Sequence, residues 1–164
     1  MPPSFLEGHN TVHSCSYPIA DLLPHAPPMV LLDQVLGWDA GQVIATITIR
    51  SDSPFFIENN GVPSYVGLEY MAQTCGIYAG IEGRNHGQPV RLGFLLGTRN
   101  FHASTGWFNL GQQLVVEAKE VYRQDTMGVF DCRIIHGDVE LASAQLNLYQ
   151  PQDASDAFSH SSKE

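Results

Sequence analysis

One stretch of the chain, from Pro63 to Ile81, is apolar on almost every side and constrains the fold more than any other. Its apolar residues recur at the spacing that places them on one face of a helix. They are Leu68, Met71, Ala72, Cys75 and Ala79. The opposite side is hardly more polar, because Glu69 is the only charged residue in the stretch. A helix that is apolar nearly all round has to be buried, so the pattern predicts one central helix wrapped by other elements.

Three glycines, Gly67, Gly76 and Gly80, interrupt the predicted helix. Each costs about 1 kcal/mol relative to alanine in a helix interior. Such residues are expected where another backbone or a second copy of the helix approaches closely, and we expect close approach at all three. The stretch is also too short, and too often interrupted by glycine, to be a transmembrane span.

Glu69 is the one residue that does not suit a purely structural helix. It lies in the first or second turn, where the helix dipole stabilises a carboxylate by roughly 0.3–1 kcal/mol. Tyr65, Glu69 and Gln73 follow one another at i, i+4 and i+8 and predict a hydrogen-bonding stripe on the rod. The spacing leaves two interpretations open: a glutamate that only stabilises the helix start, or a residue of a functional site.

The rest of the chain favours short β-strands. Residues 16–23 predict one or two helical turns that end at Pro24. A turn is expected at 38–41, a loop at 51–63, a polar connection at 82–89, and hairpin turns at 124–125 and 137–138. Six runs are expected as strands: 29–35, 43–49, 90–103, 113–123, 127–136 and 139–149. One buried helix with an antiparallel meander predicts an α+β domain in which a curved sheet wraps the rod.

Length and charge narrow the possible partners. A chain of 164 residues with 43% hydrophobic content is expected to form one domain, at 16–151, between a flexible arm at 1–15 and a disordered tail at 152–164. The net charge is −9 with only 8 lysines and arginines, which argues against binding nucleic acid or an anionic membrane. An acidic carrier protein would also be repelled unless the few basic groups cluster.

Cys15, Cys75 and Cys132 are odd in number and lack the spacing of metal ligands. Cys75 and Cys132 fall in apolar patterns and are expected in the core. Free thiols and the absence of an apolar leader after a basic start predict a cytoplasmic protein. No metal is expected.

Four motifs, in order, resemble the hotdog-fold 3-hydroxyacyl-[acyl-carrier-protein] dehydratases of fatty-acid synthesis, the FabA/FabZ-like family. LLPHAPPMVLLDQV at 22–35 is similar to the family's LLPHxxPxLLxDxV, and SPFF at 53–56 to its xPFF. EYMAQ at 69–73 is similar to EAMAQ, and GFLLG at 93–97 to a later strand, followed by GQQL at 111–114 in place of GDxL. Residues 61–63, 66–73 and 95–99 look most like a divergent branch found with aryl-polyene pigment biosynthesis. The resemblance implies a hotdog fold.

The family removes water from a 3-hydroxyacyl thioester carried on the phosphopantetheine of an acyl carrier protein. A histidine takes the α proton, and a carboxylate on the helix handles the departing hydroxyl. A backbone N–H near the helix start polarises the thioester carbonyl. The matching motif implies the carboxylate role for Glu69 and an orienting role for Gln73. The resemblance implies no metal and no organic cofactor.

The chain departs from the family where the catalytic histidine should be. The family has GHFPGxPxxPG before the helix glutamate, whereas this chain has IENNGVPS at 57–64. Within this region, together with Tyr65, the substrate-binding or orienting candidates are Asn59, Gly61 and Val62. Two histidines elsewhere are secondary candidates. His25 matches the LLPH histidine, which is not the family's base and is expected to make a structural hydrogen bond, and His102 lies in a predicted strand.

Dehydratases of this family build each site across a dimer, with histidine and acid from different subunits. This implies that the chain is a homodimer, or pairs with a second, histidine-bearing hotdog subunit to which it lends Glu69. Two alternatives remain open: a hotdog acyl thioesterase that uses Glu69 with a nearby amide, and a non-catalytic acyl-binding or scaffold subunit.

Overall fold

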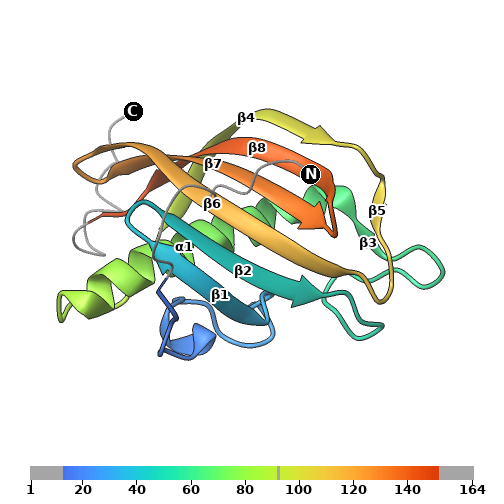
Figure 1. Ribbon diagram of the computed structural model, residues 1–164, viewed down its shortest axis with the longest axis horizontal. Helices are drawn as coiled ribbons and strands as arrows, with labels where there is room; N and C mark the ends of the chain where they lie inside the picture. The colour runs from blue at the N-terminus through green and yellow to red at the C-terminus, as the bar shows by residue number, and fades with distance from the viewer. Residues whose placement is uncertain (1–12, 92, 152–164) are drawn as a thin grey trace, which may run out of the picture.

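The apolar stretch forms the long helix α1 (Gly67–Asn85), which runs behind a curved sheet (Figure 1). The structure is a computed structural model, and it describes residues 13–91 and 93–151. Apart from residues 13–15, the arm and tail expected at the termini lie outside the described residues. Among the described residues, no helix is long and apolar enough to cross a membrane.

The helix differs from the prediction at both ends. It begins at Gly67, after a 3-10 turn η2 (Ser64–Val66), rather than at Pro63. It continues to Asn85, four residues past the predicted end, so the expected connection at 82–89 is partly helical. The last turn holds because Glu82 accepts a hydrogen bond from the Tyr78 hydroxyl, one turn earlier, and pairs with Arg123 on the sheet.

The buried side of α1 is also not the one that the spacing favoured. Of the five residues predicted to share the core face, Met71 and Cys75 are buried, whereas Leu68, Ala72 and Ala79 are only half-buried. The buried residues of α1 are Gly67, Tyr70, Met71, Gln73, Thr74, Cys75, Ile77, Tyr78, Gly80 and Ile81. Because apolar residues occur on both sides of the helix, the sequence does not indicate which side packs against the sheet.

Gly67, Gly76 and Gly80 of α1 lie where other groups approach closely, as predicted. A Cβ at Gly80 would overlap the carbonyl oxygen of Leu22, just after the 3-10 turn η1 (Ile19–Asp21). A Cβ at Gly67 would lie 2.8 Å from Ile134 Cδ1, and one at Gly76 would lie 3.0 Å from Leu23 Cδ2. The approaching groups come from the sheet and from the segment after η1, not from a second helix.

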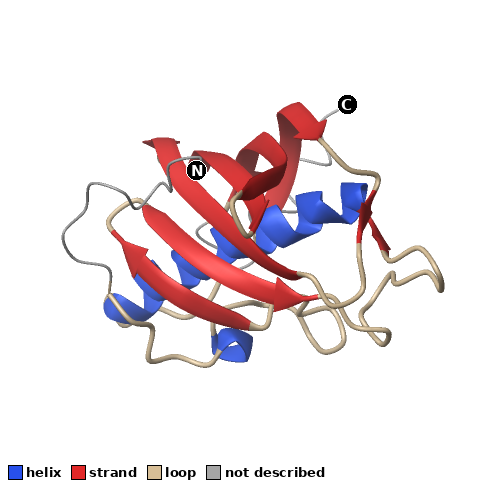
Figure 2. Ribbon diagram, turned by 45° about the vertical axis from the view of Figure 1, so that its right-hand side comes forward, coloured by secondary structure: helices blue, strands red, loops and turns tan. Residues whose placement is uncertain are grey.

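A six-stranded antiparallel sheet wraps α1, as Figure 2 shows, and the α+β hotdog architecture is confirmed. Its order is β1-β2-β6-β7-β8-β4, with a separate two-stranded pair, β3-β5. The strands are β1 (Gln34–Asp39), β2 (Gln42–Thr48), β3 (Val62–Pro63), β4 (Phe94–Ala103), β5 (Trp107–Phe108), β6 (Gln113–Gln124), β7 (Met127–His136) and β8 (Val139–Tyr149).

Two strand predictions were wrong. The strand expected at 29–35 begins only at Gln34 and runs through Asp39, so the turn lies at Ala40-Gly41 rather than at 38–41. The four strands after the helix are not a simple meander, because β4 pairs with β8 and stands at the sheet edge, while β6 pairs with β2 and β7. The two hairpin turns are confirmed: Asp125 and Gly137 adopt positive φ angles of 52° and 59°.

The core lies between α1 and the inner face of the sheet. Alternate residues of four strands, β2, β6, β7 and β8, belong to it and are almost fully buried: Val43, Ala45, Ile47, Leu114, Val116, Ala118, Phe130, Cys132, Ile134, Ala142, Ala144 and Leu146. The edge strand β4 contributes little to this core, and its Leu95, Leu96 and Phe101 are exposed. The sheet therefore ends in an open edge that carries apolar side chains.

Candidate functional site

Gln73 joins three parts of the candidate site. Its side chain is 1% exposed. Its Oε1 accepts a hydrogen bond from the Leu31 backbone N–H at 2.9 Å, and its Nε2 donates to the Met29 carbonyl oxygen at 2.7 Å and to Glu69 Oε1 at 3.1 Å. Because Gln73 takes these backbone groups, residues 29–31 bond to the helix instead of extending β1. The same amide fixes one oxygen of Glu69.

Glu69 lies in the first turn of α1, and its side chain is 41% exposed. Besides the hydrogen bond from Gln73, its Oε1 has His25 Nε2 at 3.7 Å. His25 reaches this position from the segment that follows η1, with a side chain that is 33% exposed. Its other ring nitrogen, Nδ1, is buried and has no hydrogen-bond partner. The structure thus brings one of the two secondary histidine candidates to the glutamate.

A cavity of about 250 Å³ opens beside these three residues, and Glu69, His25 and Gln73 are part of its lining. One wall is the half-exposed side of α1, where Ala72, Cys75, Gly76 and Ala79 leave room. The other wall comes from Leu95, Met127, Phe130 and Leu148 on β4, β7 and β8. From residue 69 to residue 79 the helix rises about 15 Å. The cavity is therefore a slot alongside α1 with apolar residues on both walls and the Glu69 carboxylate in its lining.

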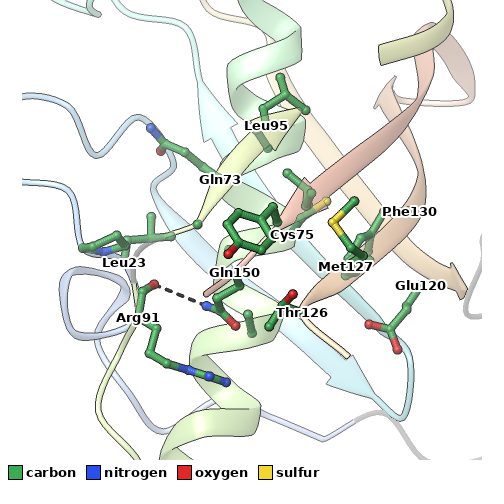
Figure 3. Close-up of a pocket in the computed structure, with 18 of the residues that line it drawn as sticks. Leu23, Gln73, Cys75, Arg91, Leu95, Glu120, Thr126, Met127, Phe130 and Gln150 are labelled. Carbon is green, nitrogen blue, oxygen red and sulfur yellow. Dashed lines mark hydrogen bonds between the residues drawn. The ribbon is translucent and has the colours of Figure 1, made fainter. Parts of the chain in front are cut away.

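Polar groups also line the cavity away from Gln73. In Figure 3, Cys75, Met127 and Phe130 lie in the middle, with Gln73 and Leu95 towards one end and Arg91, Thr126 and Gln150 towards the other. Gln150 Nε2 donates to the Arg91 carbonyl oxygen at 3.3 Å. This hydrogen bond joins the segment before β4 to the residue that follows β8.

An ion-paired network adjoins the cavity through Glu120 and Arg123, which are among its lining residues. Arg123 bonds to Glu120 Oε2 at 2.9 Å through Nε and to Glu82 Oε2 at 2.6 Å. Burial raises the pKa of Glu120, an effect that Arg123 opposes. Burial also raises the pKa of Tyr78 to about 12, although the Gly41 N–H donates to its hydroxyl at 2.9 Å. These contacts tie the last turns of α1 to the sheet.

The remaining candidates lie outside this cavity within the single chain. Tyr65 belongs to η2 and is 67% exposed. Asn59 and Gly61 adopt positive φ angles of 68° and 108°, and a Cβ at Gly61 would overlap the Phe108 carbonyl oxygen. Val62 is buried and pairs with Phe108 in the β3-β5 ladder.

His102 is exposed on β4, opposite Ser143. It is not among the residues that line the cavity. The sequence did not predict the cavity wall that the strands form, and in particular it did not predict the contributions of Met127 and Phe130. Alternation could have placed Phe130 on the inner face of its strand, but nothing in the sequence indicates that the wall stands away from α1 there.

Metal binding has no support among residues 13–91 and 93–151, where no group of three or more His, Cys, Asp or Glu residues could hold an ion. Cys75 and Cys132 are buried as predicted, with their Sγ atoms 3.6 Å apart as free thiols. Burial raises the pKa of the Cys75 thiol, which keeps it protonated and unreactive.

Comparisons with known proteins agree with this architecture. The sequence matches the family described as "ApeP-like: ApeP dehydratase" over residues 17–159. The 3-hydroxyacyl-[acyl-carrier-protein] dehydratase FabZ of Streptococcus agalactiae is 31% identical over 138 residues, covering 77% of this chain and 89% of FabZ. FabZ of Streptococcus sanguinis is 30% identical over 127 residues, covering 70% and 82%.

Two solved structures are similar in shape. The dehydratase heterocomplex ApeI:P from Xenorhabdus doucetiae matches with a TM-score of 0.85 and 28% identity, covering 90% of this chain and 99% of the other. A hypothetical thioesterase from Streptococcus pneumoniae, solved with coenzyme A, matches with a TM-score of 0.58 and 14% identity, covering 72% and 84%. At that identity the second match shows a shared fold only.

Proposed function

The chain belongs to the ApeP-like dehydratase family, and from this we propose that it is one subunit of a 3-hydroxyacyl thioester dehydratase in which Glu69 acts on the departing hydroxyl. The observation that carries the proposal is the position of Glu69. It is held by Gln73 in the lining of an apolar slot that suits an acyl chain. The names of the FabZ relatives and of the ApeI:P structure state dehydratase activity.

In the proposed reaction, a base removes a proton from the α carbon of the thioester, and the C–H electron pair forms the α,β double bond. The β carbon–oxygen bond breaks, and protonated Glu69 gives its proton to the hydroxyl, which leaves as water. The base holds the α proton at the end of the step. The products are an α,β-unsaturated thioester and water, so the reaction needs no oxidant, reductant or metal.

The base in this proposal comes from a second hotdog subunit. Acid and base have to reach different atoms of the substrate from either side, but His25 Nε2 lies 3.7 Å from Glu69 Oε1, which leaves no room for a carbon chain between them. Segment 57–64 carries no histidine. The open β4 edge, with Leu95 and Leu96 exposed, offers a surface for strand pairing with a second subunit. The name of the ApeI:P structure describes a dehydratase heterocomplex, which supports a second subunit.

The proposed substrate is an acyl group on the phosphopantetheine of an acyl carrier protein, and the proposed location is the cytoplasm. The name of FabZ supports the carrier, and the three free thiols support the location. Arg50, Arg123 and Arg133 already pair with carboxylates. With a net charge of −9, the chain has few cations for an acidic carrier, so we assign most of the carrier docking to the partner subunit.

The test mixes the purified chain with a histidine-bearing hotdog subunit and follows the dehydration of a 3-hydroxyacyl thioester. We expect activity from the pair, little from this chain alone, and a loss of about 100-fold or more with Glu69→Gln. Glu140→Gln, which changes an exposed carboxylate on β8, serves as the matched control and is expected to leave the rate unchanged. Activity of the pair that survives Glu69→Gln would refute the role of Glu69.

Thioester hydrolysis is the second candidate, and the hydrogen bond between Gln73 and Glu69 favours it because that pair needs no histidine to activate water. Hydrolysis of acyl thioesters by this chain alone, lost in Glu69→Gln, would replace the dehydratase proposal. Acyl binding without turnover under any pairing, unchanged in Glu69→Ala, would instead identify a non-catalytic subunit.

A further inference from the structure

We propose that His25 is a positioning residue for Glu69: together with Gln73 it holds one carboxylate oxygen, so that the other oxygen faces the substrate. This inference rests on the proposed function, because it assigns a role relative to Glu69 as the acid. His25 matches the LLPH histidine of the family, which is not its catalytic base. The inference gives this histidine a role in the same site as Glu69.

The two oxygens of Glu69 have different surroundings. Oε1 accepts the hydrogen bond from Gln73 Nε2 at 3.1 Å and has His25 Nε2 at 3.7 Å. Within residues 13–91 and 93–151, Oε2 makes no hydrogen bond and belongs to a side chain that lines the cavity. Oε1 therefore accepts a hydrogen bond from Gln73 and has a His25 nitrogen just beyond hydrogen-bond range, whereas Oε2 is available to a hydroxyl in the slot.

The two ring nitrogens of His25 also differ. Nδ1 is buried without a partner. A proton on Nδ1 would be a buried donor with nothing to bind, which costs more than a buried acceptor left empty. We therefore assign the proton of the neutral ring to Nε2, the atom that faces Glu69. In this tautomer the ring nitrogen that lies 3.7 Å from Oε1 carries the N–H, and a small closing movement of either partly exposed side chain would bring the two atoms into hydrogen-bond range.

This arrangement matters at the moment when Glu69 gives up its proton. The carboxyl group then becomes a carboxylate, and N–H donors already directed at Oε1 stabilise the charge as it forms. Gln73 supplies a donor that is fixed by its bonds to Met29 and Leu31. His25 supplies a second donor. Since His25 and Glu69 are both partly exposed, water screens their interaction and the expected effect is moderate.

The test uses the chain paired with its histidine-bearing partner and measures kcat and KM for dehydration in four variants. His25→Phe removes the donor and keeps a planar ring. We expect kcat to fall about 3- to 10-fold, with KM within about twofold of the parent. His25→Gln, which can direct an amide N–H at Oε1, is expected to recover most of kcat. His136→Phe, at the end of β7 and outside the cavity, is the matched control.

The fourth variant, Glu69→Gln/His25→Phe, shows whether His25 acts through Glu69. If it does, His25→Phe lowers kcat no further once Glu69 is already changed, so the two effects do not add. A kcat for His25→Phe within twofold of the parent, or full additivity in the double variant, overturns the role of His25 while leaving Glu69 in place. A pair that stays active with Glu69→Gln overturns both proposals. Should His25→Phe not fold, His25→Ala takes its place with the same limits.

Discussion

Replacing Gln73 by leucine tests whether this buried amide holds the site together. The substitution nearly preserves volume and removes three hydrogen bonds. The Leu31 N–H belongs to a residue only 5% exposed, and leaving it unpaired costs about 1–3 kcal/mol. Met29 is 42% exposed, so water can replace the bond to its carbonyl at a cost of about 0–1 kcal/mol. Losing the bond to the partly exposed Glu69 costs about 0.5–1 kcal/mol.

The extra apolar surface of leucine offsets about 1 kcal/mol of this loss. We therefore expect Gln73→Leu to lower the free energy of unfolding by about 0.5–4 kcal/mol, measured by urea titration with circular dichroism. Gln124→Leu is the control, because Gln124 is exposed on β6 and accepts one hydrogen bond, from the Tyr122 hydroxyl. A loss below about 0.5 kcal/mol in Gln73→Leu would show that segment 29–31 does not depend on Gln73.

Three further outcomes are expected. Gly80→Ala should lower the free energy of unfolding by about 1–3 kcal/mol in urea titrations, because its Cβ would overlap the Leu22 carbonyl. Gly83→Ala, which has room for a methyl group, should raise it by about 0.5–1 kcal/mol in the same titrations. Burial raises the pKa of Tyr78 to about 12, above the usual value of about 10, so the unfolded chain loses this proton first and stability falls by up to about 1.4 kcal/mol per pH unit between those values. Tyr78→Phe should flatten that decline in urea titrations at alkaline pH, and an unchanged slope would contradict the assignment. Leu96→Lys, at a position 57% exposed on the β4 edge, should keep the melting temperature but weaken binding to the hotdog partner at least about tenfold by calorimetry.

The central helix could be predicted because apolar residues occur on nearly all of its sides, which gives a long apolar segment in the sequence. Its orientation could not, since Leu68 and Ile77 look equally suited to the core and only the completed sheet decides between them. The strand expected at 29–35 failed for a related reason. Residues 29–31 have strand-like composition, but their backbone groups bond to Gln73, which lies more than 40 positions away along the chain.

In the candidate site, contacts between residues one helical turn apart could be predicted from their spacing, whereas contacts between distant segments could not. The i, i+4 relation of Glu69 and Gln73 predicted that their side chains meet, and they are hydrogen-bonded. Tyr65 stands at the same spacing before Glu69, but the change from α1 to a 3-10 turn gives it a different direction. The approach of His25 to Glu69 depends on how the segment after η1 folds over the helix, which no pattern within either segment reports.

The close contacts at the glycines of α1 limit how the slot could widen to admit a larger acyl group. Gly67 meets Phe108 and Ile134 near one end of α1, and Gly80 meets the backbone at Leu22 near the other. Close packing near both ends of α1 restricts its movement against the sheet and against the segment after η1. In the single chain, the opposite wall is less restrained at its edge, because β4 pairs with β8 on one side only. The cavity of the single chain is therefore freest to widen at the β4 edge of the sheet.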